Sequence, residues 1–354
     1  MHLHTAPRKH LVIRCDASES IGSGHLMRMI ALAQEWQRTG GVVDFVCAEI
    51  APAFEQRILS ENLRIQRLSA APGSGEDREA TSAWISRYAK GEYSPTVALD
   101  GYQFDDEFQL AIKKTGARLL VVDDYGHAGF YHADWVLNQN ISAEEELYSR
   151  RGPKTRLLLG SQFVLLRGEF LKYGGWKRPI PSSGRKVLVT LGGSDPENFT
   201  LKVIEVLACL DLEVRVIAGG ANPNLKTLSL AIERAKTSGL NARLDMNPPD
   251  MPAIMAWADF AISAGGSTVW ELAFMGLPSF LLITAENQSE STLELIRRES
   301  FLQIKLSDFL EPLPLKRKIM NIASDQPMRT RISHQTRHIV DGRGASRVCC
   351  ILNK

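Results

Sequence analysis

One stretch near the start of the chain decides the fold: Leu11-Val-Ile-Arg-Cys-Asp-Ala-Ser-Glu-Ser-Ile-Gly-Ser-Gly-His-Leu-Met-Arg28. It begins with an apolar run, which is typical of a buried strand in a parallel sheet. A loop with two glycines follows, and apolar side chains then recur at helical spacing as far as Trp36. A strand, a glycine-rich loop and a helix in this order predict an α/β domain that binds a ligand at the carboxyl end of its strand.

Apolar runs alternate with helical patterns along the rest of the chain, which predicts parallel sheets with helices on both faces. After the first strand at 11–14, strands are predicted at 42–47, 96–99, 118–122, 135–137, 186–191, 213–218, 259–263 and 278–283. Gly, Pro and Ser are concentrated at 173–185, which predicts a linker. The expected architecture is two doubly wound, Rossmann-like domains, 1–172 and 186–354, that face each other across a ligand cleft.

The composition argues against several classes of protein. The 354 residues include 42 Lys+Arg and 40 Asp+Glu, and a net charge of +2 argues against nucleic acid as a partner. There is no run of about 18 apolar residues to span a membrane, and the first ten residues do not resemble a signal peptide. The five cysteines have neither disulfide-type nor metal-type spacing, so we expect a cytoplasmic protein without structural zinc. A monomer is the default expectation.

The loop after the first strand offers a first candidate site. Its glycines let the backbone approach a ligand closely, and the helix start presents N–H groups to an anion. His25 can act there as a general base, or it can cap or pack the helix. Asp16 can orient His25, contact a sugar hydroxyl or cap the loop, and Arg28 can hold an anion or pair on the helix surface. The substrate-binding residues expected in this region are Arg14, Asp16, Gly22, Ser23, Gly24 and Arg28.

Two later strand ends add further polar residues. After the strand at 96–99, Asp100 and Tyr102 can contact a ligand, although the tyrosine can equally be a packed residue. After the strand at 118–122, Asp123 and Asp124 form an acidic pair. No other His or carboxylate near this pair has a metal-ligand spacing, so we expect no metal site.

The second half of the chain predicts a nucleotide site. Two of its strands run into glycine turns, and the second turn opens a helix, where backbone N–H groups and the helix dipole attract a diphosphate. Glu271 can accept hydrogen bonds from ribose hydroxyls or close a capping box with Ser267, although a spacing of four fits that box poorly. The amides of Asn287 and Gln288 can address a sugar or phosphate, or they can be ordinary loop polarity. The expected nucleotide-binding residues are Gly192, Gly193, Gly265, Gly266, Ser267, Thr268 and Glu271.

Taken together, these motifs resemble a known family. Arg14-x-Asp16 followed by Ile21-Gly-x-Gly-His25-x-x-Arg28 resembles the N-terminal signature of the UDP-2,4-diacetamido-2,4,6-trideoxy-β-L-altropyranose hydrolases of the pseudaminic acid pathway. That family is close to a spore-coat polysaccharide biosynthesis family. The other motifs that look familial include Leu99-Asp-Gly-Tyr102, Leu191-Gly-Gly-Ser-Asp195, Ala264-Gly-Gly-Ser-Thr-x-Trp-Glu271 and Glu286-Asn-Gln288. The Gly-Gly-Ser-Thr pattern is shared more widely with glycosyltransferases of the two-Rossmann, GT-B fold.

The resemblance implies hydrolysis of a UDP-activated diacetamido-trideoxy sugar at its anomeric carbon, with inversion and without a metal or cofactor. It makes His25 the catalytic base and makes Tyr102 and Asn287 substrate-orienting groups, with Gln288 beside them and the nucleotide on the second domain. A single base suffices because UDP is a good leaving group. The alternative is a GT-B glycosyltransferase in which His25 activates an acceptor hydroxyl. A non-catalytic sugar-nucleotide binding protein and a hydrolysing epimerase are weaker alternatives.

Overall fold

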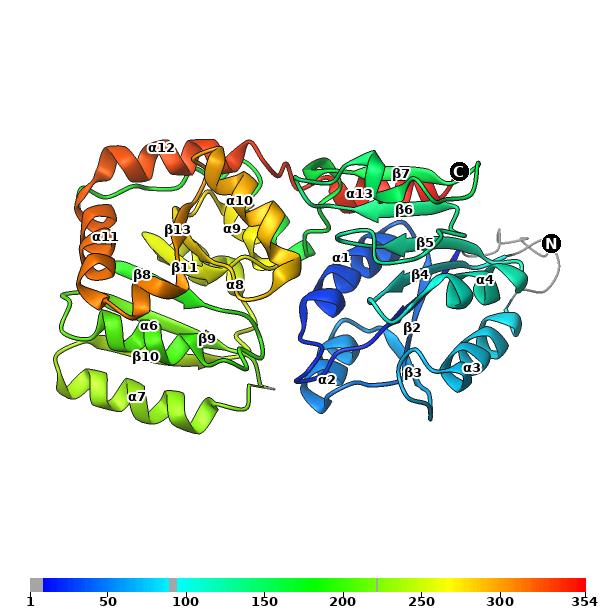
Figure 1. The fold of residues 1–354 in the computed structure, drawn as a ribbon, viewed down its shortest axis with the longest axis horizontal. Helices are drawn as coiled ribbons and strands as arrows, with labels where there is room; N and C mark the ends of the chain where they lie inside the picture. Colours follow the sequence, from blue (N-terminus) through cyan, green and yellow to red (C-terminus); the bar gives the residue numbers. More distant parts are fainter. Residues whose placement is uncertain (1–8, 89–93, 221) are drawn as a thin grey trace, which may run out of the picture. The chain divides into compact units, whose positions relative to one another are not determined.

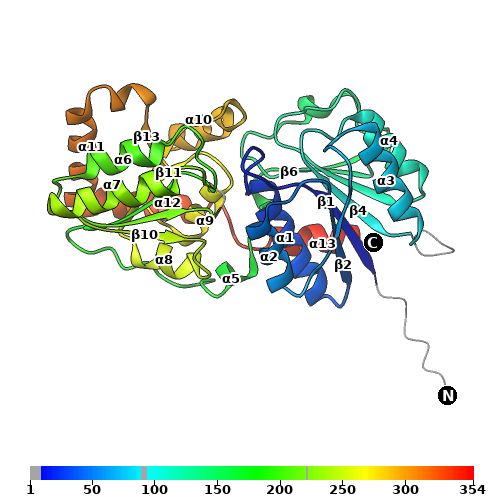
Figure 2. The same cartoon turned by 90° about the horizontal axis from the view of Figure 1, so that it is seen from below.

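The computed structural model describes residues 9–88, 94–220 and 222–354, and the chain divides into two units. The first unit runs to Gly168 and also includes Arg343–Lys354, and the second unit is Glu169–Gly342. Each unit contains one sheet of parallel strands with helices on both faces (Figures 1 and 2). None of the helices in the described ranges is long and apolar enough to cross a membrane.

The first unit is built on a seven-stranded sheet with the order β3-β2-β1-β4-β5-β6-β7. Its strands are β1 (His10–Cys15), β2 (Val42–Cys47), β3 (Arg64–Arg67), β4 (Thr96–Asp100), β5 (Arg118–Val122), β6 (Trp135–Asn138) and β7 (Arg156–Leu159). Helices α3 (Gly75–Ser86) and α4 (Asp106–Lys114) pack on one face of the sheet, around the buried Val97 and Phe108. Helix α1 (Gly24–Arg38) packs with α13 (Gly344–Leu352) on the other face (Figure 2). Helix α2 (Pro52–Ser60) follows β2.

The second unit is built on a six-stranded sheet with the order β10-β9-β8-β11-β12-β13. Its strands are β8 (Lys186–Thr190), β9 (Glu213–Ala218), β10 (Asn241–Met246), β11 (Phe260–Ala264), β12 (Ser279–Leu282) and β13 (Leu302–Ile304). Its helices are α6 (Phe199–Leu207), α7 (Leu225–Thr237), α8 (Met251–Trp257), α9 (Thr268–Met275), α10 (Ser289–Arg297), α11 (Pro312–Ser324) and α12 (Gln326–Arg337). The short helix α5 (Gly168–Leu171) begins at the boundary between the units. Fully buried side chains such as Val189, Ile232 and Ile319 form the core between the sheet, α7 and α11.

All nine predicted strands are present, and each end lies within one residue of its predicted position. The sequence analysis missed β3, β7, β10 and β13, and these four are the edge strands of the two sheets. An edge strand has one partner and more solvent around it, so its residues need not be apolar. In β3, for example, Arg64-Ile-Gln-Arg67 exposes most of its side chains and contains no apolar run.

Two predicted domain boundaries are corrected by the structure. The predicted linker, 173–185, belongs to the second unit. Arg178 fixes it there by donating hydrogen bonds of 2.6–3.0 Å to the carbonyl oxygens of Met255, Ala258 and Met275. The last residues, 343–354, were predicted to lie in the C-terminal domain but return to the first unit as α13. A helical pattern does not specify which sheet the helix covers, so the local sequence could not reveal this return.

Candidate functional site

The first candidate site lies where the connections of the first sheet change direction. Strands β1 and β4 are neighbours, but the chain continues from β1 toward β2 on one side and from β4 toward β5 on the other. In open α/β sheets, ligands bind outside the carboxyl ends of the strands at such a point. The parallel register pairs Cys15 with Asp100, so the loops that follow β1 and β4 leave the sheet side by side.

The loop after β1 brings His25 to this edge of the sheet. The Ser18 hydroxyl accepts a hydrogen bond from the Ile21 N–H, and Gly22 follows in the left-handed region with φ +81°. Glycine adopts this conformation without steric cost. Helix α1 then begins at Gly24, and the side chain of Ser23 does not cap it. His25 therefore lies in the first turn of α1, next to the end of β4.

The imidazole ring of His25 is paired with a buried carboxylate. His25 Nδ1 lies 2.7 Å from Oδ1 of Asp100, the last residue of β4. Burial alone would raise the pKa of Asp100, but the charges of Arg28 and His25 hold that pKa below its usual value. Within the described residues, every hydrogen bond of the His25 ring runs through Nδ1. A proton on Nδ1 that is donated to Asp100 leaves Nε2 as an acceptor, which is the arrangement of a general base.

Arg28 lies one turn further along α1 and connects two carboxylates. Its Nε and Nη2 each donate to Asp100 at 2.6 Å, and its Nη1 donates to Asp124 at 2.7 Å. Burial lowers the pKa of Arg28, but the two carboxylates outweigh this effect and raise the pKa well above its usual value. The hydroxyl of Tyr102 donates to Oδ2, the second carboxylate oxygen of Asp124, at 2.7 Å. The rings of Tyr102 and His25 pack edge to face, with their centroids 4.9 Å apart.

The structure therefore brings His25, Arg28, Asp100 and Tyr102 together as one hydrogen-bonded cluster, although they come from two separate parts of the sequence. Asp124 also belongs to this cluster, but the sequence analysis considered it only as half of a rejected metal pair. Its signal was its position directly after β5, the strand beside β4. Asp100, for which the sequence predicts a ligand contact, is fully buried, accepts hydrogen bonds from Arg28 and lies 2.7 Å from His25 Nδ1.

Arg14 and Asp16, for which the sequence predicts substrate binding, make contacts within the protein. The Arg14 side chain is fully buried and pairs with Asp16 at 2.7 Å and with Asp77 at 2.5 Å. Asp16 Oδ1 also accepts the backbone N–H groups of Ala48 and Glu49, which follow β2. These contacts tie the loop after β1 to the loop after β2. Asp16 does not contact His25, so its role is to hold the shape of the loop.

Asp123, the neighbour of Asp124, is occupied by the protein itself. It accepts the backbone N–H groups of Tyr125 and Gly126 and pairs with His127 Nδ1 at 2.6 Å. Burial would raise the pKa of Asp123, but the hydrogen bond and charge of His127 hold it far below its usual value. The described residues contain no group of three His, Cys, Asp or Glu side chains that could hold a metal ion.

The second candidate site occupies the same topological position in the second unit. Strands β8 and β11 are neighbours at the point where the connections change direction. Gly192 and Gly193 follow β8, and Gly265–Thr268 follow β11 and open α9. A Cβ atom on Gly265 would lie 2.1 Å from the Thr292 hydroxyl oxygen, so this position accepts only glycine without rearrangement. The structure thus gathers the predicted glycine turns at one sheet edge.

The helix start and the next strand end complete this second site. The side chain of Ser267 does not cap α9, so a capping box between Ser267 and Glu271 is not formed. Glu271 is partly exposed in the first turn. Asn287 is exposed and Gln288 is half-buried in the short helical turn after β12, the strand beside β11. Gln288 accepts hydrogen bonds from the Thr284 N–H and hydroxyl groups, and its Nε2 lies near Gly266.

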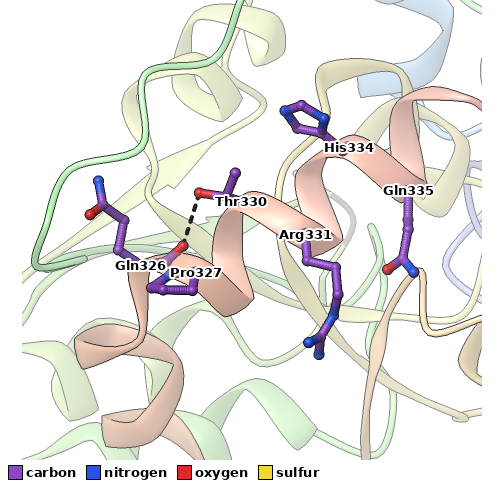
Figure 3. Close-up of a pocket in the computed structure, with 6 residues that line it drawn as sticks. All are labelled: Gln326, Pro327, Thr330, Arg331, His334 and Gln335. Carbon is purple, nitrogen blue, oxygen red and sulfur yellow. Dashed lines mark hydrogen bonds between the residues drawn. The ribbon is translucent and has the colours of Figure 1, made fainter.

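A separate depression lies along α12 and contains none of the candidate residues (Figure 3). It is lined by Gln326, Pro327, Thr330, Arg331, His334 and Gln335. All six residues come from one helix, and the Thr330 hydroxyl donates to the Gln326 carbonyl within that helix. Nothing on this surface converges on a common point, so we do not assign it a ligand.

Comparison with known sequences confirms the resemblance expected from the motifs. The chain is 25% identical to the spore coat polysaccharide biosynthesis protein SpsG of Bacillus subtilis, over 97% of each chain. It is 24% identical to the UDP-2,4-diacetamido-2,4,6-trideoxy-β-L-altropyranose hydrolase of Campylobacter jejuni, over 82% of this chain and 97% of that protein. It is 30% identical to the pseudaminic acid cytidylyltransferase and hydrolase of Helicobacter pylori, over 53% of this chain and 34% of that longer protein. No family model matches the chain.

Comparison with solved structures confirms the predicted fold class of two Rossmann-like domains. The structure of MurG from Acinetobacter baumannii aligns with a TM-score of 0.61, 16% identity, and coverage of 98% of this chain and 99% of that chain. The Anabaena protein Alr3699/HepE in complex with UDP aligns with a TM-score of 0.60, 13% identity, and coverage of 98% and 99%. At these identities, the similarity establishes a GT-B-type architecture and nothing finer.

Proposed function

We propose that this chain is a nucleotide-sugar hydrolase that cleaves a UDP-linked 2,4-diacetamido-2,4,6-trideoxy sugar into UDP and the free sugar, as a step toward a nonulosonic acid. The relatives from Campylobacter jejuni and Helicobacter pylori bear the name of such a hydrolase and support this substrate class. The single observation that carries the proposal is the His25–Asp100 pair at the carboxyl edge of the first sheet.

The proposed reaction begins with a water molecule that attacks the anomeric carbon. Nε2 of His25 accepts a proton from this water while its oxygen forms the new bond to carbon. The bond between the anomeric carbon and the diphosphate oxygen breaks, and its electron pair leaves with UDP. Because attack and departure take place on opposite faces of the sugar, the configuration is inverted. Asp100 keeps the proton on Nδ1 of His25 and stabilises the imidazolium that forms.

The second unit supplies the nucleotide site in this proposal. The turn Gly265–Thr268 and the uncapped start of α9 present backbone N–H groups at the switch point of the sheet. Such groups favour a diphosphate, and the favourable interaction increases as negative charge develops on the leaving group. Glu271 would accept hydrogen bonds from the ribose, and Asn287 and Gln288 would contact the phosphate or sugar.

The test uses the UDP-linked diacetamido-trideoxy-altrose in ¹⁸O-labelled water, without added metal and without an acceptor. We expect the label in the free sugar and none in the phosphate of UDP. Label in the phosphate would show attack at phosphorus and would refute this mechanism. If UDP is released only when an acceptor alcohol is added, and the sugar is found bonded to that alcohol, the chain is a glycosyltransferase instead.

The His25→Asn variant tests the base. We expect it to lose turnover by about a hundredfold or more, while UDP affinity stays within about threefold of the native value. Such a difference would place His25 in the chemical step and outside the nucleotide site. A variant that keeps most of its turnover would show that another group is the base.

A further inference from the structure

Arg28 has an unusual position for a cation in a substrate site, because its hydrogen bonds are directed to the protein. Three of its nitrogen atoms donate to Asp100 and Asp124, and only 6% of the side chain is exposed. Nη2 also lies 3.2 Å from Nδ1 of His25. A guanidinium group that is occupied in this way has no free edge with which to clamp a substrate anion.

We propose that Arg28 is a positioning residue that controls the proton on His25 and links the base to Tyr102, and that it does not bind substrate. The kinetic part of this inference rests on the proposed hydrolase function, but the inference about the imidazole ring does not. Both parts follow from one geometric fact: a single planar cation holds the carboxylate that faces His25 and the carboxylate that faces Tyr102.

The first consequence concerns charge. The groups that face His25 are Asp100 from β4, Arg28 from α1 and the Tyr102 ring. The charge of Asp100 also contributes to raising the pKa of the nearby Cys15 thiol. The cation at 3.2 Å opposes a second proton on the ring, whereas the anion favours it. Arg28 also keeps Asp100 ionised, so that Asp100 accepts the Nδ1 proton. The proton is therefore held on Nδ1, and Nε2 is left as the acceptor.

The second consequence concerns orientation. The guanidinium plane makes a two-pronged contact with Asp100 and reaches Asp124 with its remaining nitrogen. Lysine offers one ammonium group and cannot reproduce this fork. Tyr102 and Asn140 both donate to Asp124, so a shift of Asp124 would move Tyr102 relative to His25.

Nuclear magnetic resonance of ¹⁵N-histidine-labelled protein tests this inference without any substrate. The His25 signal is assigned by its absence from the spectrum of His25→Asn. In the native protein we expect the neutral tautomer with the proton on Nδ1. In Arg28→Gln, measured at the same pH, we expect the ¹⁵N signals of His25 to depart from this tautomer pattern, because a nearby cation has been removed. Arg38→Gln is the matched control: Arg38 lies on the same helix, its side chain is 68% exposed, and it pairs with Glu35, outside the candidate cluster.

The outcomes are separable from those of the hydrolase test. Unchanged ¹⁵N signals of His25 in Arg28→Gln, or a proton on Nε2 in the native protein, would overturn the inference even if the protein hydrolyses its substrate. If Arg28→Gln does not fold, Arg28→Lys decides. The lysine keeps the charge, so we expect native-like ¹⁵N signals of His25 together with a kcat about tenfold lower and a KM within about threefold of the native value. Native kcat in Arg28→Lys, or a loss confined to KM, would show that Arg28 does not act by holding the base.

Discussion

Replacement of Asp100 by asparagine tests the central pair of the candidate site. The substitution keeps the size and shape of the side chain, so the 2.7 Å contact with His25 can persist through the amide oxygen. It removes the negative charge from a fully buried position where Arg28 donates to the native carboxylate and His25 Nδ1 lies 2.7 Å from it. The expected loss is therefore electrostatic rather than steric.

The size of the effect follows from the charge that develops during the reaction. When His25 takes a proton from water, the imidazolium faces Arg28 at 3.2 Å and no longer has Asp100 to balance it. Two unit charges about 4 Å apart interact by about 4 kcal/mol at an effective dielectric constant near 20. Asp124 still offsets part of the charge of Arg28, so we take about half of this value. A loss of about 2–3 kcal/mol in transition-state stabilisation corresponds to a kcat lower by about 30- to 150-fold.

The assay measures UDP release at saturating substrate, with urea unfolding as a check that the variant is folded. Asp44→Asn is the control, because Asp44 forms another Asp–His contact in this unit, 2.6 Å from His10 on β1 and outside the candidate site. We expect Asp44→Asn to keep native kcat. If folded Asp100→Asn retains kcat within about threefold, or if Asp44→Asn loses as much as Asp100→Asn, the role given to Asp100 is wrong.

Three other expectations concern stability and reactivity. Gly265→Ala should destabilise the chain by about 1–3 kcal/mol in urea unfolding, since the new Cβ would meet the Thr292 hydroxyl, and adding Thr292→Ala should recover most of the loss. Burial lowers the pKa of His127, but Asp123 outweighs burial and raises it above its usual value. This pair therefore adds stability below about pH 6.5, and that stability is lost as the pH rises through the folded-state pKa of His127. If the free energy of unfolding falls by the same amount over this pH range in Asp123→Asn as in the native protein, this expectation is wrong. A thiol reagent should label two cysteines in the native protein and five in urea, and rapid labelling of a third native thiol would contradict the observed burial. The exposed thiols are Cys209 and Cys350, and the buried ones are Cys15, Cys47 and Cys349. Burial raises the pKa of Cys349 to about 12, which makes its thiolate scarce.

The sequence predicted the interior of both sheets and failed at their edges, for a physical reason. A central parallel strand is covered on both faces and flanked on both sides, so its residues must be apolar, as in Arg118-Leu-Leu-Val-Val122. An edge strand such as Asn241-Ala-Arg-Leu-Asp-Met246 has one open side, and its polar residues hide the strand from a search for apolar runs. The same search could not find the return of α13, which is a property of tertiary contacts.

The candidate site shows the same division between what is local and what is not. His25 could be singled out because the features that mark it lie next to it: a strand end, a glycine loop and a helix start. The function of Asp100 depends on a partner 75 residues away, and the sequence analysis expected a substrate contact for it. The pairing of β1 with β4 decides the matter, because it aligns Cys15 with Asp100 and carries the carboxylate beneath the first turn of α1. Strand order alone would have placed the two loops together, but only the register and the burial of the side chain show that Asp100 faces His25 and Arg28 inside the protein. Arg28 follows the same rule: its charge marks it as an anion site in the sequence, and the buried Asp100 with the part-buried Asp124 make it an internal counter-ion in the fold.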